Sequence, residues 1–173
     1  MLIPKDFIAF DFETTGFAPP CKIIEIGAVR VLDGLITEEF QTFINPCCAI
    51  PRQITELTGI HQHMVANAPI IESALLRFII FLGDLPIAAH NASFDMKFLN
   101  YEANRLGYHL KNQVVDTLAL SRAHFPRLNN HKLATVAQYI GITNEKEHRG
   151  LYDAIVVAGI LARLNNKELR KPV

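Results

Sequence analysis

Two carboxylates stand two residues apart at the end of a short apolar run. The run covers residues 7–12, and Asp11 and Glu13 continue its strand pattern. Because successive side chains of a strand point to opposite faces, we expect Asp11 and Glu13 on the same face. Like charges held together in a partly dry site either take up protons or bind a cation. The pair therefore predicts a site for acid chemistry or for a metal ion.

Two further carboxylates stand in segments with helical patterns. Asp95 is expected in the first turn of a helix, on the inward stripe that also carries Phe98 and Leu99. Acidic residues are also common in first turns because they interact favourably with the helix dipole, so Asp95 alone decides little. Asp153 belongs to a segment that is apolar over most of its circumference, and no Lys or Arg follows one turn later. A buried charge of this kind is costly unless it is paired or binds a metal, so Asp153 favours a metal site.

His148 is a candidate general base five residues before Asp153. Within one helix, at about 100° per residue, the two side chains would point well apart. They converge only if His148 lies on the loop or cap before the helix, an arrangement that Gly150 makes plausible. A histidine beside carboxylates can then accept a proton near neutral pH. On its own, His148 would more often be an ordinary surface residue.

The order of these residues resembles that of the DEDDh (DnaQ-like) 3′–5′ exonucleases, the family that contains the proofreading epsilon subunit of bacterial DNA polymerase III. The likeness runs from about residue 7 to residue 164. It depends on six short segments that occur in order at sensible spacing: residues 11–16, 23–28, 57–60, 90–95, 116–118 and 148–154.

The resemblance implies an RNase H-like fold and two divalent ions, Mg²⁺ or Mn²⁺. It implies that Asp11, Glu13, Asp95 and Asp153 bind these ions and that His148 is the base. Such ions prefer hard oxygen ligands, and two of them can stabilise both the attacking and the leaving oxygen at phosphorus. The chain departs from the family pattern in having Gly150 where Ala is usual and Tyr152 where a smaller or acidic residue is frequent.

The residues expected to contact substrate are less specific. As in the family that the chain resembles, the backbone at positions 14–16 would lie beside the 3′-terminal nucleotide. Leu57 and Ile60 would pack on terminal bases, and the ring of Phe94 would stack near the scissile bond. Simple core packing is an equal alternative for these apolar residues. Asp116 is expected to organise the sheet edge and not to bind metal. The substrate-binding candidates are Thr14, Thr15, Gly16, Leu57, Ile60, Asn91 and Phe94.

The elements that would position the site predict an α/β fold with a mixed five-stranded sheet flanked by helices. An Asp33-Gly34 turn signal joins the second and third strands as a hairpin. We expect one exonuclease domain over residues 1–173, with a core at about 5–164 and a frayed tail at 165–173. Strands are expected at 7–12, 22–31, 38–44, 87–90 and from 114, and helices at 53–58, 71–82, 93–106, 117–124, 132–140 and 151–164.

Composition limits the partners. Lys and Arg balance Asp and Glu at 17 each, so the overall basic charge typical of a high-affinity DNA-binding protein is absent. Three cysteines, without a Cys-x-x-Cys pair, indicate free thiols in a reducing compartment. No signal peptide or membrane span is expected, so the predicted location is the cytoplasm. We expect a monomer or homodimer that acts on nucleic acid 3′ ends, with a DNA polymerase as a possible partner.

The function predicted from these residues is metal-dependent 3′–5′ exonuclease activity. The expected substrates are single-stranded or frayed DNA ends, cleaved to nucleoside 5′-monophosphates in proofreading or repair. One alternative keeps the chemistry but acts on RNA or short oligoribonucleotides. Another is a non-catalytic module that stabilises a polymerase, although such a module has no need of four buried acids.

Overall fold

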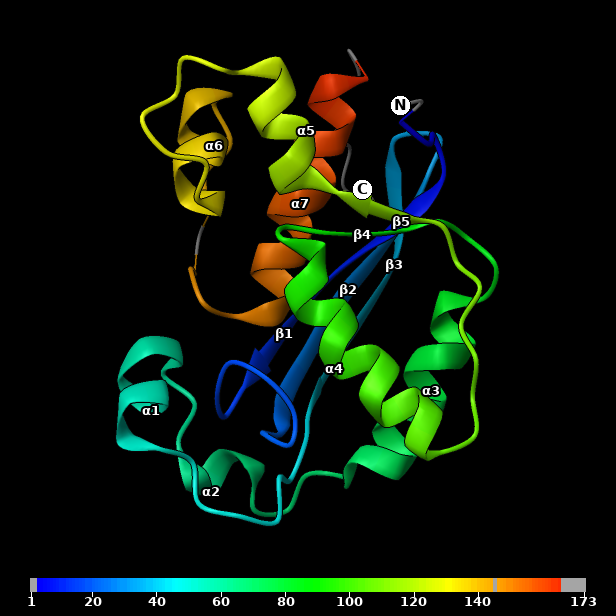
Figure 1. Cartoon of the computed structure of the whole chain (residues 1–173), viewed down its shortest axis with the longest axis vertical. Helices are drawn as coiled ribbons and strands as arrows, with labels where there is room; N and C mark the ends of the chain where they lie inside the picture. Colours follow the sequence, from blue (N-terminus) through cyan, green and yellow to red (C-terminus); the bar gives the residue numbers. More distant parts are fainter. Residues whose placement is uncertain (1–2, 145, 166–173) are drawn as a thin grey trace.

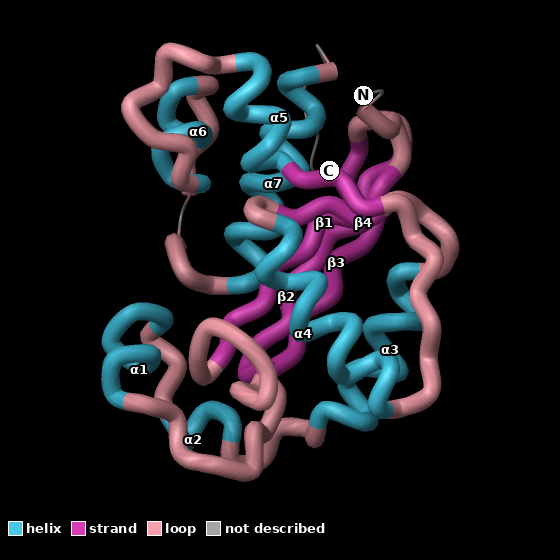
Figure 2. Tube along the Cα trace, viewed as in Figure 1, coloured by secondary structure: helices cyan, strands magenta, loops and turns pink. Residues whose placement is uncertain are grey.

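A mixed five-stranded sheet forms the centre of the molecule (Figures 1 and 2). A computed structural model describes residues 3–144 and 146–165. The strands follow the order β3-β2-β1-β4-β5. Their bounds are β1 Phe7–Thr14, β2 Ile23–Leu32, β3 Leu35–Phe43, β4 Ile87–Ala89 and β5 Val114–Asp116.

The antiparallel half of the sheet follows from local signals. Asp33 and Gly34 have φ angles of 46° and 77°, the left-handed values that a tight hairpin turn requires. They connect β2 to β3, as the sequence predicts. Strand β1 pairs with β2 along its whole length, and Asp11 lies opposite Gly27. Because this pairing continues through Thr14, β1 is longer than the predicted strand at 7–12 and includes both of its carboxylates.

The parallel half of the sheet is short and leaves the end of β1 open. Strand β4 pairs with β1 only at Ile8 and Ala9. Beyond Ala9, the edge of β1 that faces β4 therefore has no strand beside it. The C-terminal end of β1 is thus free to accept contacts from helices.

Helices cover both faces of the sheet, and the alternation along β1 matches the two layers. Phe7 and Ala9 belong to an apolar cluster with α7, whereas Ile8, Phe10 and Phe12 belong to the cluster with α3 and α4. Figure 1 shows α7 behind α5 on one side and α3 and α4 on the other. The helices are α1 Arg52–Thr58, α2 Gln62–Val65, α3 Ile71–Leu82, α4 Ala92–Arg105, α5 Thr117–His124, α6 Leu133–Tyr139 and α7 Gly150–Leu164.

The helix predictions agree with the structure apart from details at the ends. Short helix α2 was not predicted, because four residues give no periodic signal. Pro51 precedes α1 and is not its first residue. Of the predicted frayed tail at 165–173, only Asn165 lies within the described residues, and its side chain donates a hydrogen bond to the Pro4 carbonyl at 3.1 Å.

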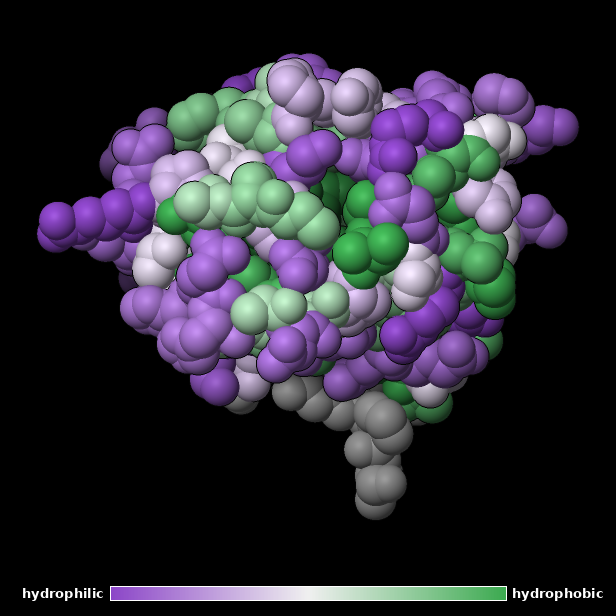
Figure 3. Space-filling view, turned by 90° about the horizontal axis from the view of Figure 1, so that it is seen from below, coloured by the Kyte–Doolittle hydropathy of each residue, from purple (hydrophilic) through white to green (hydrophobic). Residues whose placement is uncertain are grey.

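The surface of the described residues is mixed in character. In the view from below, apolar side chains form patches separated by hydrophilic ones (Figure 3). Within the described part of the chain, no helix has the length and hydropathy needed to cross a membrane. Cys21, Cys47 and Cys48 are all free thiols, as predicted.

Candidate active site

The first turn of α4 closes the open end of β1. Asp95 lies in this turn and is only 2% exposed. Its Oδ1 accepts a hydrogen bond from the Phe12 backbone N–H at 3.1 Å, a donor on the stretch of β1 that β4 does not reach. Burial raises the pKa of Asp95 to about 7, although the hydrogen bond from Phe12 opposes this rise. Asp95 is thereby fixed directly behind the carboxylates of β1.

The first turn of α7 brings Asp153 to the same place from the other side of the sheet. Asp153 is 6% exposed, and each of its oxygens accepts one hydrogen bond. Asn144 Nδ2 donates to Oδ1 at 2.6 Å, and the His148 backbone N–H donates to Oδ2 at 3.0 Å. His148 takes a left-handed φ of 58° in the turn before the helix. It therefore lies on the preceding loop, the arrangement that the sequence requires for convergence.

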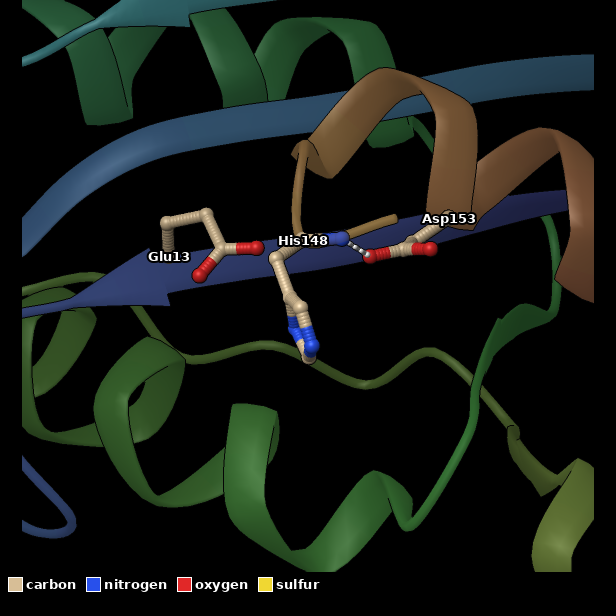
Figure 4. Close-up of side chains that lie close together, drawn as sticks. All are labelled: Glu13, His148 and Asp153. Atoms are coloured by element: carbon tan, nitrogen blue, oxygen red, sulfur yellow. Dashed lines mark hydrogen bonds between the residues drawn. The ribbon is translucent and has the colours of Figure 1, made fainter. Parts of the chain in front are cut away.

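Glu13, His148 and Asp153 form a group that could hold a metal ion. One potential ligand atom from each lies within 4.8 Å of the others. Figure 4 shows Glu13 on β1, His148 on the loop before α7 and Asp153 on α7, with the imidazole directed away from that helix. His148 is thus close enough to serve as a ligand as well as the predicted base. Asp11 lines the same cavity, whereas Asp95 is buried and is not among the described residues that line it.

Neighbouring carboxylates raise the pKa values of Asp11 and Glu13. Burial raises the pKa of Asp11 well above its ordinary value, and the charges of Asp95, Glu13 and Asp153 raise it further. Burial first, and then Asp153, raise the pKa of Glu13 to about 8. Burial also raises the pKa of Asp153. Carboxylates held this close repel one another when they are ionised. They are a donor set suited to hard divalent cations, whose positive charge would relieve this repulsion.

A fifth carboxylate, Glu25, is neutralised by protein groups. It is completely buried on β2, opposite Glu13. Arg149 binds it in a bidentate manner, with Nε at 3.1 Å and Nη2 at 3.0 Å, and the Gly150 N–H donates to it at 3.2 Å. This pair ties the His148 loop to the sheet. Glu25 stands in one of the family-like segments, but its partner 124 positions later could not be identified from spacing.

Glycine at position 150 has a packing reason. The backbones of Gly27 on β2 and Gly150 on α7 approach so closely that a Cβ on Gly27 would overlap the Gly150 carbonyl carbon. A Cβ on Gly150 would lie 2.9 Å from Gly27 N and 3.1 Å from the Asp11 carbonyl oxygen. The departure from the usual Ala therefore accompanies a tight contact between the helix start and the sheet.

An open cavity of about 600 Å³ lies in front of the carboxylates. Of the predicted site residues, Asp11, Glu13, Leu57, His148 and Asp153 line it. Five further lining residues from the α6 side and the loops carried no predicted role at the site, and only His90 stands in a segment that carried the family resemblance. These are His90, Leu133, Ala134, Asn144 and Glu147. Lys132, one of the scattered basic residues that could bind a phosphate, also lines the cavity.

The predicted nucleotide loop uses its side chains to close on itself. Thr14 Oγ1 donates to the Gly16 carbonyl at 2.6 Å, and Thr15 Oγ1 accepts from the Lys22 N–H at 2.8 Å. A Cβ on Gly16 would meet the Cys21 side chain. The absence of a side chain at position 16 therefore serves the packing of this loop, whatever it also permits toward a ligand.

The remaining substrate candidates have mixed outcomes. Ile60 is fully buried in a small cluster with Ile24 and Ile54, so the predicted base contact is wrong for Ile60 and the alternative of core packing holds. Leu57 is 52% exposed at the cavity and remains available. Phe94 is half-buried and packs against Phe98 at 5.3 Å between ring centroids, which also fits core packing.

Asn91 and Asp116 meet at the end of β4. Asn91 adopts a left-handed φ of 63° at the start of α4, and its side chain makes no capping hydrogen bond. Its backbone N–H donates to Asp116 Oδ1 at 3.0 Å. The same oxygen accepts from the Leu118 N–H at 2.9 Å at the start of α5. Asp116 therefore organises the sheet edge, as expected.

Comparison with known proteins defines the family. The family model described as Exonuclease (RNase_T) matches residues 8–161. The chain therefore belongs to this exonuclease family, as a DEDDh-type 3′–5′ exonuclease domain.

Curated relatives add a polymerase context. The chain is 45% identical over 157 residues to a DNA polymerase III PolC-type from Clostridium perfringens, with 90% of the chain aligned. It is 38% identical over 167 residues to the DNA polymerase III PolC-type of Bacillus subtilis, with 95% of the chain aligned. The chain spans only 11% and 12% of the lengths of these two relatives.

Solved structures share the fold, which confirms the predicted architecture. Exonuclease X in complex with 5′ overhanging duplex DNA matches with a TM-score of 0.77 at 24% identity, covering 94% of this chain and 95% of that one. A 3′-exonuclease described as recognising the histone mRNA stem-loop matches with a TM-score of 0.79 at 22% identity, covering 98% and 86%.

Proposed function

We propose that this chain removes nucleotides from single-stranded or frayed 3′ ends of DNA and releases nucleoside 5′-monophosphates. The observation that carries the proposal is the convergence of Asp11, Glu13, His148 and Asp153 from β1, α7 and the loop before it at one open cavity, with Asp95 of α4 hydrogen-bonded to the β1 backbone between Asp11 and Glu13. The cavity of about 600 Å³ falls in the size range of small-ligand sites and could hold a terminal nucleotide.

Two divalent ions, Mg²⁺ or Mn²⁺, fit the donor set. Asp11, Glu13, Asp95 and Asp153 would hold them, as the resemblance to the family implies. Glu13 and Asp153 offer oxygens that lie within 4.8 Å of each other and of a ring nitrogen of His148, and Asp11 lines the same cavity. Asp95 acts electrostatically on Asp11 from the first turn of α4. When bound, such ions supply charge that stabilises the attacking and leaving oxygens at phosphorus.

His148 would act as the general base in this reaction. Its backbone is anchored to Asp153 and its exposed side chain lines the cavity, so the ring can reach a water molecule beside a bound phosphodiester. The imidazole would accept the proton of that water as its oxygen attacks phosphorus. The neighbouring carboxylate charges would stabilise the imidazolium that forms.

The polymerase relatives favour DNA as substrate and proofreading as the task. Because the chain corresponds to a small part of each relative, we propose that it works with or within a DNA polymerase. RNA trimming is the second candidate, since the neighbour described with histone mRNA has the same fold. A purely non-catalytic module is disfavoured, because it would keep mutually repelling acids without using them.

The deciding experiment compares matched DNA and RNA oligomers that carry a 5′ label. Degradation from the 3′ end that requires Mg²⁺ or Mn²⁺ and favours DNA would support the proposal. The Asp11→Ala variant is the matched control, and it should show no degradation. Preference for RNA would favour the second candidate, and absence of metal-dependent degradation of either oligomer would reject nuclease activity for this chain.

A further inference from the structure

The cavity has one wall that the reaction described above does not use. Asp11, Glu13 and Asp153 line the cavity from β1 and α7, whereas this wall comes from the start of α6. Lys132, immediately before α6, lines this wall. Among the described residues that line the cavity, Lys132 is the one whose side chain keeps a full positive charge at neutral pH.

The charge of Lys132 is not consumed by the protein. The ion pairs found within residues 3–144 and 146–165 do not include it. Arg149, the other cation near the site, behaves differently because two of its three guanidinium nitrogens, Nε and Nη2, donate to Glu25. The side chain of Lys132 is exposed and therefore available to an anion in the cavity.

The backbone that carries Lys132 is held in place from three sides. His90 directly follows β4, and its Nε2 hydrogen-bonds the His131 carbonyl at 2.8 Å. The His131 ring in turn lies 3.1 Å from the Ser121 hydroxyl. The Lys132 N–H donates to Asn130 Oδ1 at 3.1 Å. A flexible side chain thus extends from a fixed point on the cavity wall.

We infer that Lys132 binds the phosphodiester next to the scissile one on the substrate strand. This inference rests on the proposed function. The scissile phosphate would lie at the carboxylate cluster, and no carboxylate of the described residues lies within ion-pair distance of Lys132. A cation that lines the same cavity but forms no ion pair with the cluster suits a second phosphate. Lys132 is therefore a positioning residue for the strand and not a catalytic residue.

Substrates with one and two or more phosphodiesters test this assignment. Thymidine 5′-monophosphate p-nitrophenyl ester has only the bond that is cleaved, whereas oligothymidylate has further phosphates. Lys132→Ala should lower kcat/KM on the oligomer about tenfold, mainly through KM, as expected for the loss of a charged contact. It should leave cleavage of the nitrophenyl ester within about twofold of the wild-type value, because no second phosphate is present. Lys132→Arg should restore most of the loss.

Salt dependence gives a second readout that a merely structural role would not change. Binding of a fluorescent oligothymidylate, measured by anisotropy in Ca²⁺, should weaken in Lys132→Ala. The slope of the logarithm of the binding constant against the logarithm of the salt concentration should become shallower by about 0.7. This is the value for one phosphate contact on a single strand. Lys111→Ala removes an exposed lysine that does not line the cavity and is the control.

The possible failures are distinguishable. Equal loss on both substrates would mean that Lys132 acts at the scissile phosphate, and an unchanged oligomer reaction with an unchanged salt slope would mean that it contacts no phosphate. Either result overturns the inference. If the wild-type chain cleaved neither substrate, the proposed function would fail, and the anisotropy measurement would still decide whether Lys132 binds the strand.

Discussion

Replacing Glu13 by Gln should stabilise the metal-free chain while removing its activity. Glu13 is 8% exposed, and its pKa rises from 4.5 to about 8. At pH 7.5 the folded chain therefore retains a proton that the unfolded chain has lost. Each pKa unit corresponds to about 1.4 kcal/mol, so the raised pKa would lower the free energy of unfolding by about 4 kcal/mol if Glu13 titrated alone. Because coupled neighbours share the protons, we expect Glu13→Gln to raise the free energy of unfolding by about 2 kcal/mol.

The sign of the pH dependence follows from the direction of the shift. A raised carboxyl pKa means that stability increases as pH falls from about 8 toward 4.5, since the folded chain binds the proton more tightly. Glu13→Gln lacks this titration. In EDTA its Tm should exceed that of the wild type by about 4–8 °C at pH 7.5, and by only about 1–3 °C at pH 5. Thermal unfolding followed by circular dichroism at both pH values measures the difference.

Manganese provides the matching control. Mn²⁺ favours the ionised carboxylates, so it should raise the Tm of the wild type more than that of Glu13→Gln. A variant that melts at or below the wild type at pH 7.5 in EDTA would refute the reasoning about repulsion. An equal gain at pH 5 would also refute it, because the effect would then be unrelated to the titration of Glu13.

Three further predictions concern the supports of the site. His148→Ala should lower kcat about 100-fold and flatten its pH profile while the Mn²⁺-induced rise in Tm persists; loss of that rise would instead make His148 a ligand. Arg149→Ala should lower stability by about 3 kcal/mol, because it leaves Glu25 buried without its partner, and the Arg149→Ala/Glu25→Gln double variant should recover part of this loss in urea unfolding. Gly27→Ala should prevent stable folding, as judged by circular dichroism, because its Cβ would overlap Gly150, and a soluble variant with wild-type Tm would contradict the close approach.

Local pattern determined much of this protein. Strand alternation predicted that Asp11 and Glu13 lie on the same face of one strand, and both belong to β1. The apolar stripe of residues 71–82 matches α3. The predicted first-turn position of Asp95 agrees with the structure, and the helix predicted at 151–164 contains Asp153, which lies in the first turn of α7. These elements could be predicted because periodicity and turn chemistry act over a few residues. The order of the acids along the chain then sufficed to indicate the family.

Only the tertiary structure decided which distant groups meet. Glu25 pairs with Arg149, Ile60 is buried in a core and not at the cavity, and Lys132 lines the same cavity as the carboxylates of β1 and α7. The Asn144 contact that fixes Asp153 also joins residues from different elements. The physical reason is that such contacts depend on how strands and helices pack, and no spacing along the chain encodes that packing.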